Sequence, residues 1–402
     1  MMKNLFCWRN NWLIFILLLS TTPSWTQSLH AIWILNEGNS ASGESVSLGR
    51  FDPTFNSYET VMTFPDANFA SDVIASDDGI YIAAENGVYR LDPDTHELLA
   101  EADVPSARKL ALFNGSLYVT RGDIAPLDSY LWALDALDLE VEEVFQAVTG
   151  VGPEVPAEGM VAVGQELIIA VNNGFSWGEE VGRIGRLTEQ GEYSEWNLPE
   201  GAENPVHLFA HGDDICVISN GSWDQTTLTR MDLVNDMVLT ISLPEVTAGC
   251  NAAALVGEDR IAFQISGETH LRQADVNTLE EEENLMLNGA TYYAMATDPT
   301  TGVIYASHTD WVSYGQVEMF AADGMFLGSF DCGVSPGNLA MEIRETTSDI
   351  CPDDMKASQD WVPVAAWDLS GKRLETQVSG VRPWTLRVEQ SASGEVRKLM
   401  CP

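Results

Sequence analysis

The segment Ser71–Thr95, which reads SDVIASDDGIYIAAENGVYRLDPDT, determines the predicted fold. It contains three short apolar runs separated by Asp77-Asp78-Gly79 and Glu85-Asn86-Gly87. Gly and Asn tolerate the positive φ that tight hairpin turns need, so the segment predicts three antiparallel strands. A fourth strand is expected over Leu98–Ala102, after the turn Asp92-Pro93-Asp94-Thr95. The whole segment therefore predicts one four-stranded antiparallel sheet.

The turn that closes this unit recurs along the chain. Its first polar residue can be followed as Asp52, Asp92, Asp135, Thr188, Asp232, Asp275 and Asp323. The spacing of 40 to 53 residues is typical of propeller blades, and such sheets must stack radially to bury both faces. No amphipathic helical pattern of useful length is present. The sequence predicts an all-β protein, a seven-bladed β-propeller with a small C-terminal β-sandwich-like tail.

The first and last repeats are expected to share one blade. Residues 31–63 contain three predicted strands and lack an innermost one, whereas Asn338–Ile343 is an apolar strand to spare at the far end. A blade built from both ends leaves no unpaired sheet edge in the ring. We therefore expect the propeller to span residues 27–343, closed by the strand at 338–343.

The N-terminus has the features of an export signal. Lys3 and Arg9 precede an apolar run, Trp12–Leu19, and a polar exit follows. A membrane anchor would need about 20 apolar residues, and this run is much shorter. Residues 1–26 are therefore expected to be a signal peptide, and the mature protein is expected to have no transmembrane segment.

The composition changes near residue 344. Residues 27–355 contain 55 acidic and 11 basic side chains, whereas residues 356–402 contain 5 acidic and 7 basic ones. The second part has its own strand and turn pattern. We expect a linker at 344–357 and a separate small β domain at 358–402.

The net charge of −40 argues against nucleic acid or an anionic membrane as a partner, because both bind basic surfaces. Solubility outside the cell explains the charge most simply, and attraction of cations or basic ligands is the alternative. No cofactor is expected, with calcium left open, although no EF-hand spacing is present. In an exported protein, Cys332 and Cys351 are the best disulfide candidates, and Cys216 with Cys250 are weaker ones.

Two resemblances extend this interpretation. The segments Ile32–Asn39, Val88–Thr95 and Leu117–Gly122 resemble YVTN-type (YncE-like) surface propellers of Bacteroidetes type, over roughly residues 31–343. The tail segments Trp367–Leu374 and Val388–Leu399 resemble a degenerate C-terminal sorting domain of the type IX secretion system. The resemblance implies a non-catalytic binding scaffold, secreted or at the cell surface of a Gram-negative bacterium. Some relatives capture corrinoids, and an outer-membrane uptake or surface partner is a further expectation.

The candidate ligand site is a set of loop residues expected at one mouth of the ring. Loops between the second and third strands are long in five repeats, and three of them carry a tryptophan. Exposed loop aromatics with polar neighbours favour binding, although such rings can also pack between blades. The predicted ligand, a small organic molecule or a glycan, would contact Asn36, Glu37, Arg121, Asp123, Asn172, Trp177, Asn220, Trp223, Asp310 and Trp311.

An enzyme is the alternative function. The sequence has no Gly-x-Ser-x-Gly elbow and no phosphate-binding loop, so no catalytic residue is predicted. His207 and His211 fall on one face of an inner strand, and two histidines without a nearby carboxylate are more often structural than metal ligands. A metal-dependent hydrolase or lactonase acting in the central channel remains the second hypothesis.

Overall fold

The computed structural model describes residues 25–221, 224–285 and 287–347 and the tail strands at 363–367, 373–374, 385–391 and 396–401. Side chains are described between 27 and 345, except at 222, 223, 250 and 286. Every regular element in these ranges is a β-strand. The predicted all-β fold is confirmed.

Five antiparallel sheets of four strands, numbered in chain order, form most of the described ring. Sheet 1 contains β27 (Pro336–Thr347), β1 (Trp25–Asn36), β2 (Val46–Asp52) and β3 (Ser57–Phe64). Sheet 2 contains β4 (Asp72–Ser76), β5 (Gly79–Ala84), β6 (Gly87–Leu91) and β7 (Leu98–Asp103). Sheet 3 contains β8 (Ala107–Phe113), β9 (Ser116–Arg121), β10 (Ser129–Asp135) and β11 (Val141–Gln146). Sheet 4 contains β12 (Ala157–Val163), β13 (Glu166–Val171), β14 (Arg183–Thr188) and β15 (Tyr193–Asn197). Sheet 5 contains β16 (Pro205–His211), β17 (Asp214–Gly221), β18 (Gln225–Asp232) and β19 (Met237–Pro244).

The sixth sheet has seven strands and two halves. Its first half contains β20 (Ala248–Val256), β21 (Arg260–Ile265) and β22 (Arg272–Asp275). Its second half contains β23 (Ala294–Thr297), β24 (Ile304–His308), β25 (Tyr314–Phe320) and β26 (Phe326–Val334). The halves meet in parallel pairing of β20 with β23, at Asn251 and Ala294. Seven blades result if the halves are separate blades, and that number stays a prediction.

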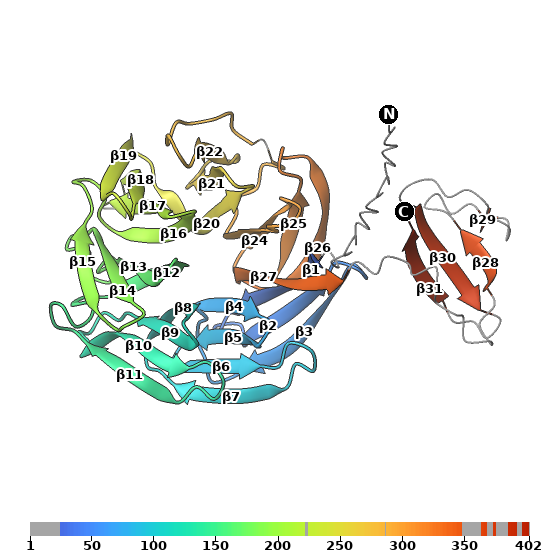
Figure 1. The fold of residues 1–402 in the computed structure, drawn as a ribbon, viewed down its shortest axis with the longest axis horizontal. Helices are drawn as coiled ribbons and strands as arrows, with labels where there is room; N and C mark the ends of the chain where they lie inside the picture. Colours follow the sequence, from blue (N-terminus) through green and yellow to red (C-terminus); the bar gives the residue numbers. More distant parts are fainter. Residues whose placement is uncertain are drawn as a thin grey trace, which may run out of the picture. The chain divides into compact units, whose positions relative to one another are not determined.

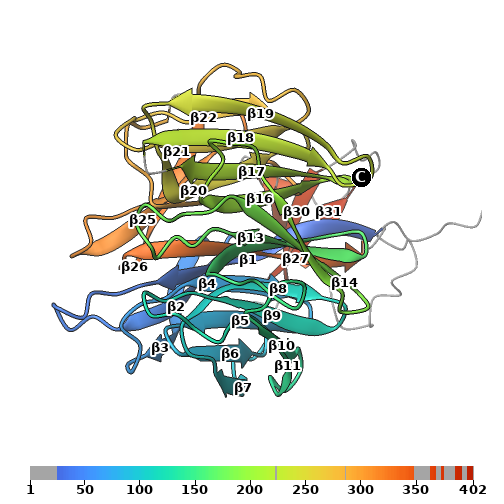
Figure 2. The same ribbon diagram turned by 90° about the vertical axis from the view of Figure 1, so that its left-hand side faces the viewer.

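The sheets follow one another around a ring. Strands β4, β8, β12, β16, β20 and β23 contact one another in succession, and β7, β11, β15 and β19 lie at the outside (Figure 1). Seen from the side, β16, β17, β18 and β19 follow in order from the middle outward (Figure 2). Apolar clusters fill the interfaces between neighbouring sheets, such as Val88 and Leu117 between sheets 2 and 3. Burial between sheets therefore stabilises the ring.

Sheet 1 combines both ends of the ring unit, which spans Gln27–Arg344. Its order is β27-β1-β2-β3. On one side it packs against β26, where Phe51 stacks on Phe330 with ring centroids 3.8 Å apart. On the other side Arg344 contacts the turn of sheet 2, with Nη1 at 2.7 Å from an Asp94 carboxylate oxygen. The first and last strands are thus joined by both pairing and packing.

The recurring aspartates have a local structural role. The Asp92 carboxylate accepts the backbone N–H groups of Asp94 and Thr95 at 2.9 and 2.7 Å, and Asp52, Asp135, Asp232 and Asp275 repeat this geometry. Such Asx turns satisfy backbone donors that the hairpin leaves unpaired. The repeat in the sequence is therefore a repeat of turn chemistry.

The tail is described by itself. Its strands β28 (Pro363–Trp367), β29 (Arg373–Leu374), β30 (Thr385–Ser391) and β31 (Val396–Cys401) form one antiparallel sheet in the order β29-β28-β30-β31. The predicted signal peptide and most of the predicted linker lie outside the described residues, so these boundaries stay predictions.

No helix among the described residues is long and apolar enough to cross a membrane.

The predicted disulfides stay untested. Cys332 is a free, buried thiol in the cluster that joins β26 to sheet 1, and burial raises its pKa to about 12. Its expected partner Cys351 lies outside the described residues. Cys216 is also free and buried, and the side chain of Cys250 is not described.

Candidate functional site: the axial pocket

The inner strands surround a cavity of about 410 Å³, which we call the axial pocket. Every sheet of the ring, or a loop that adjoins it, contributes to the wall, because the lining residues lie near the start of an inner strand, near the end of a second strand or in an adjoining loop. They are Glu37, Phe69, Ala70, Ser71, Arg108, Lys109, Glu158, Asn172, Gly174, Phe175, Asn204, Val206, Asn220, Asn251, Tyr293 and Asn338. A small-molecule pocket typically has a volume of about 300–1,000 Å³.

Bulges at the start of the inner strands position several of these side chains. In β8, Ala107 pairs with Arg121 and Leu110 pairs with Val119, so the β8 segment has one extra residue. Strands β12, β16 and β20 have register shifts at the same place. A bulge interrupts the in-and-out alternation of a strand and re-aims side chains. This explains how the consecutive residues Arg108 and Lys109 both line the pocket.

Arg108 is a charged residue of the pocket wall with two fixed contacts. Its Nε and Nη2 lie 2.9 and 2.8 Å from Oε1 of Glu158 on the neighbouring sheet. Its guanidinium also lies over the Phe175 ring, 5.2 Å from the centroid. Glu158, as the nearest opposite charge, raises the pKa of Arg108. The guanidinium is thus held by one carboxylate and one aromatic face.

Lys109 is tied more tightly to the wall. Its Nζ donates to the Ser71 carbonyl at 3.0 Å and to Asn338 Oδ1 at 3.1 Å, and it lies 3.6 Å from Asp72. Burial raises the pKa of Asp72, and the Lys109 charge opposes that shift. Because Asn338 belongs to β27 and Ser71 precedes β4, Lys109 links three neighbouring parts of the ring beside the pocket.

Glu37 is an acidic side chain of the pocket wall, in the loop after β1. It accepts a hydrogen bond from the Tyr293 hydroxyl at 2.6 Å. Burial raises the pKa of Glu37, while that hydrogen bond and the charges of Lys109 and Arg108 lower it. The Tyr293 ring also packs edge-on against Trp311, with centroids 4.3 Å apart. Glu37 and Tyr293 therefore form a second polar group of the pocket wall, in which the Tyr293 ring is held in place.

Asparagines connect neighbouring sheets around the pocket. Asn172 donates to Asn204 Oδ1 at 3.1 Å, and Asn204 donates to the Asn220 carbonyl at 3.2 Å. Asn220 in turn donates to the Ala248 carbonyl at 3.1 Å, and Asn251 donates to the Gly337 carbonyl at 3.0 Å. Buried polar groups need such partners, so these amides both brace the ring and make the pocket wall polar.

The structure places the predicted site residues in three groups. Glu37, Asn172 and Asn220 line the axial pocket. Asn36 and Arg121 are buried: Asn36 donates to the Tyr58 hydroxyl at 3.1 Å, and Arg121 donates to the Pro105 and Ser129 carbonyls, each at 2.9 Å. The third group lies on exposed loops or outside the described residues.

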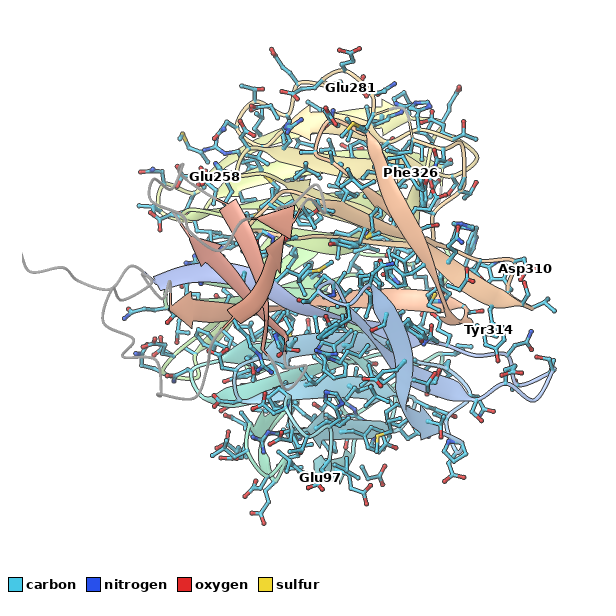
Figure 3. The ribbon with its side chains drawn as sticks, turned by 90° about the vertical axis from the view of Figure 1, so that its right-hand side faces the viewer. Glu97, Glu258, Glu281, Asp310, Tyr314 and Phe326 are labelled. Atoms are coloured by element: carbon cyan, nitrogen blue, oxygen red, sulfur yellow. The ribbon has the colours of Figure 1, made fainter. Side chains whose placement is uncertain are left out.

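In that third group, Asp123 accepts from the Ser106 hydroxyl at 2.8 Å, and Trp177 is 77 % exposed. Asp310 caps its own turn through Ser313, which lowers its pKa to about 2, and lies beside Tyr314 at one extremity of the ring unit (Figure 3). Trp311 packs against Tyr293, which lines the pocket. Trp223 lies outside the described residues.

The sequence interpretation missed Arg108, Lys109, Glu158, Asn251 and Tyr293. These residues stand one or two positions before the apolar core of an inner strand, as in Arg108-Lys109 before Leu110. That shared position is the signal that could have identified them. In the loop after β13, Phe175 lines the pocket, two residues from the predicted Trp177.

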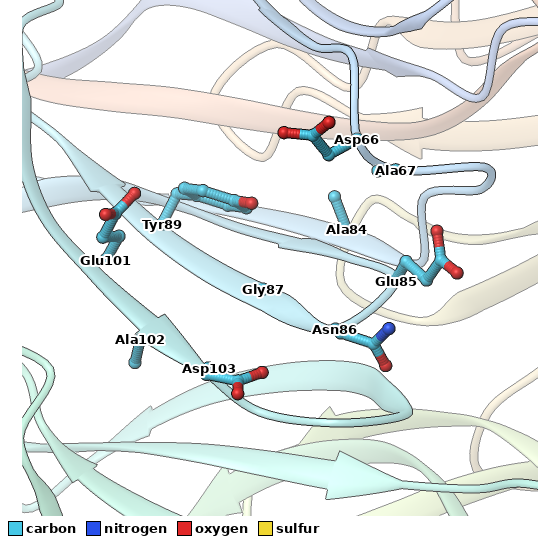
Figure 4. Close-up of a pocket in the computed structure, with 10 residues that line it drawn as sticks. All are labelled: Asp66, Ala67, Ala84, Glu85, Asn86, Gly87, Tyr89, Glu101, Ala102 and Asp103. Atoms are coloured by element: carbon cyan, nitrogen blue, oxygen red, sulfur yellow. The ribbon is translucent and has the colours of Figure 1, made fainter.

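A second hollow of about 470 Å³ lies on the outer part of sheet 2. Figure 4 shows Tyr89 with acidic side chains around it, among them Asp66, Glu101 and Asp103. Glu85 there is already engaged by the Asn68 backbone at 2.6 Å. This hollow draws on few elements and one kind of charge, so the axial pocket is the better candidate site.

Among the described residues, no three His, Cys, Asp or Glu side chains group as a metal site would require. The two histidines of β16 contact different residues: His211 Nε2 lies 3.2 Å from Asn277 Oδ1, and His207 stacks with Phe209.

Comparison with known proteins gives a fold. No family model matches the chain, and no curated protein matches it. Among solved structures, a proposed 6-phosphogluconolactonase from Bacteroides fragilis superposes with a TM-score of 0.54 at 13 % identity, over 80 % of this chain and 99 % of that one. A β-propeller domain from Myceliophteria thermophila superposes with a TM-score of 0.51 at 9 % identity, over 71 % and 95 %. The ring is a β-propeller.

A third similar structure is the extracellular domain of a proposed one-component system from B. thetaiotaomicron. It has a TM-score of 0.54 at 10 % identity and covers 92 % of this chain and 57 % of that one. At these identities the propeller likeness shows the fold alone, and function must be argued from the axial pocket.

Proposed function

We propose that this protein is an exported ligand-binding propeller that holds a small polar organic molecule in its axial pocket. One observation carries the proposal: a single cavity is lined by charged, amide and aromatic side chains from the sheets of the ring and the loops that adjoin them. A few convergent polar groups in a concave site are the usual features of small-molecule recognition.

The proposed site lies in the axial pocket, whereas the sequence predicted a site formed by exposed loops at one mouth of the ring. Arg108, Glu158 and Tyr293 replace exposed loop residues such as Asp123 and Trp177 as the proposed contacts. Export is supported by the signal-like N-terminus, by the resemblance to surface propellers and type IX sorting domains, and by an extracellular domain among the similar structures. Secretion or display at the cell surface of a Gram-negative bacterium, with an outer-membrane uptake or surface partner, belongs to the same proposal.

Ligand binding can be tested by a thermal-shift screen of the full-length protein against a metabolite library that includes corrinoids, sugars and Ca²⁺. Hits should stabilise the wild type and lose their effect in Arg108→Gln. Arg186→Gln is the matched control, because Arg186 also pairs with a glutamate, Glu166, and stacks on a ring, Trp196, away from the pocket. Hits that survive Arg108→Gln unchanged would place the binding site elsewhere.

A hydrolase is the second candidate function. Two carboxyl groups line the pocket in different environments: burial raises the pKa of Glu37, whereas Glu158 is paired with Arg108. A carboxyl group whose pKa is raised by burial is a candidate general acid. A similar structure is also named as a proposed lactonase. Turnover of lactones or glycosides that disappears in Glu37→Gln would support this function over binding alone.

A further inference from the structure

We infer that the ligand of the axial pocket is a neutral saccharide. This inference rests on the proposed binding function and names the chemical class of its ligand. It follows from the way charges, hydrogen-bond capacity and aromatic rings are distributed in the pocket wall.

The two cationic groups of the pocket are already paired, and Glu37, the carboxylate outside these pairs, accepts the Tyr293 hydroxyl. Arg108 is bound by Glu158 at 2.8 Å, and Lys109 is bound by Asp72, Ser71 and Asn338. An anionic ligand would compete with Glu158 or Asp72 for these cations. A carboxylate that it displaced would stay partly buried without its partner, which is strongly destabilising. A neutral ligand can bind with both pairs intact.

The remaining hydrogen-bond capacity is mixed. Within the part of the chain that the structure describes, Nη1 of Arg108 has no protein acceptor, and Oε2 of Glu37 and of Glu158 has no protein donor. The pocket therefore offers a free donor beside free acceptors. A hydroxyl group both donates and accepts, so neighbouring hydroxyls on one sugar ring can satisfy both kinds of group.

Aromatic rings supply the apolar contact. Phe175 is fixed between Arg108 and Gly122. A Cβ at position 122 would lie 2.4 Å from the Phe175 ring, so only glycine leaves room for the ring there. Tyr293 is fixed by Glu37 and Trp311. Rings that are already immobilised lose little entropy when a ligand packs on them. Their faces suit the C–H face of a pyranose ring, while the planar amide and guanidinium groups suit its edge.

The experiment is a glycan array probed with the full-length protein, with neutral, acidic and amino saccharides in equal number. Bound members are then measured by isothermal titration. Neutral saccharides should bind about tenfold or more tightly than their uronate and amino counterparts. Arg108→Gln should weaken binding about tenfold, as expected for loss of a hydrogen bond to a charged group.

Tyr293→Phe is the second variant, because it removes the hydroxyl that orients Glu37 and keeps the ring. It should also weaken binding. Tyr193→Phe is its matched control: Tyr193 donates to Glu195 at 2.8 Å in the outer strand β15 and should leave binding unchanged. Melting temperatures of all variants separate loss of binding from loss of fold.

Three results would overturn the inference. Preferential binding of uronates or amino sugars would replace the ligand class and leave the site intact. Saccharide binding that Arg108→Gln and Tyr293→Phe do not change would move the site. If no saccharide binds, the ligand class is wrong, and the proposed function survives only if the metabolite screen gives Arg108-dependent hits.

Discussion

The Phe51 ring tests whether the two ends of the ring unit close on each other in solution. Phe51 in β2 is 1 % exposed and stacks on Phe330 of β26, beside a hydrogen bond from Gly333 N–H to the Tyr58 hydroxyl that spans 275 residues of chain. An aromatic ring buries about 150–250 Å². At about 25 cal/mol per Å², Phe51→Ala loses about 4–6 kcal/mol as an upper bound. Core Phe→Ala variants lose about 3–5 kcal/mol, so we expect about 4 kcal/mol.

The assay is urea unfolding followed by circular dichroism and tryptophan fluorescence. Phe263→Ala is the matched control, because Phe263 is fully buried in the cluster between sheets 5 and 6, which follow each other in the chain. Both variants should lose a similar free energy of unfolding. A loss of less than about 1 kcal/mol for Phe51→Ala, beside a full loss for Phe263→Ala, would refute the closed ring.

Three further variants test the polar contacts of the ring. Lys109→Met should lower the free energy of unfolding by about 2–4 kcal/mol, because it leaves Asp72 buried without its partner. Burial already raises the pKa of Asp72. The loss should therefore be largest at neutral pH and shrink as the pH falls and the carboxyl takes up a proton. Asp92→Asn should reduce the loss of stability in acid, because backbone hydrogen bonds lower the pKa of Asp92 in the folded protein. The contribution of Asp92 to stability is present above the unfolded pKa of about 3.9 and is lost as the pH falls through the folded pKa. An unchanged pH profile of urea midpoints would contradict this. Arg344→Gln should lower the free energy of unfolding by about 1–2 kcal/mol, measured by thermal or urea unfolding. Glu342 is 2 % exposed, and without Arg344 it keeps only the Trp33 indole at 2.9 Å among its described side-chain partners. No loss would show that solvent compensates the carboxylate.

The fold could be predicted because its signals are local and repeated. The Asp92 turn and its repeats are visible in the sequence, since an Asx turn needs only an aspartate and the following backbone. The small apolar inner strands, such as Val73-Ile74-Ala75 within β4, are likewise read directly from the chain. Both signals depend on a few neighbouring residues, and so one sequence suffices to find them.

The site could be predicted only in part, because side-chain direction at the inner strands depends on bulges. A regular strand would turn Arg108 and Lys109 to opposite faces. The extra residue between Ala107 and Leu110 turns both toward the pocket. The sequence shows their position before the apolar core of the strand but does not mark the bulge that makes both side chains face the pocket. Loop length and exposed tryptophans instead favoured Trp177, which lies two residues beyond the pocket residue Phe175.

The same bulges separate the site from the core. Leu110 belongs to the apolar cluster between sheets 2 and 3, whereas its neighbour Lys109 lines the pocket and bonds to a different sheet. Substitution at Leu110 opens a cavity in an interface, but substitution at Glu158 or Asn251 changes the pocket wall without touching an apolar cluster. Ligand choice can therefore change at a smaller cost in stability than a substitution in the apolar core brings. Variants at Asn251 should alter which ligand binds and lower the unfolding free energy by about 1 kcal/mol, the usual contribution of one hydrogen bond such as that to the Gly337 carbonyl. A much larger loss of stability would show that Asn251 is part of the structural core.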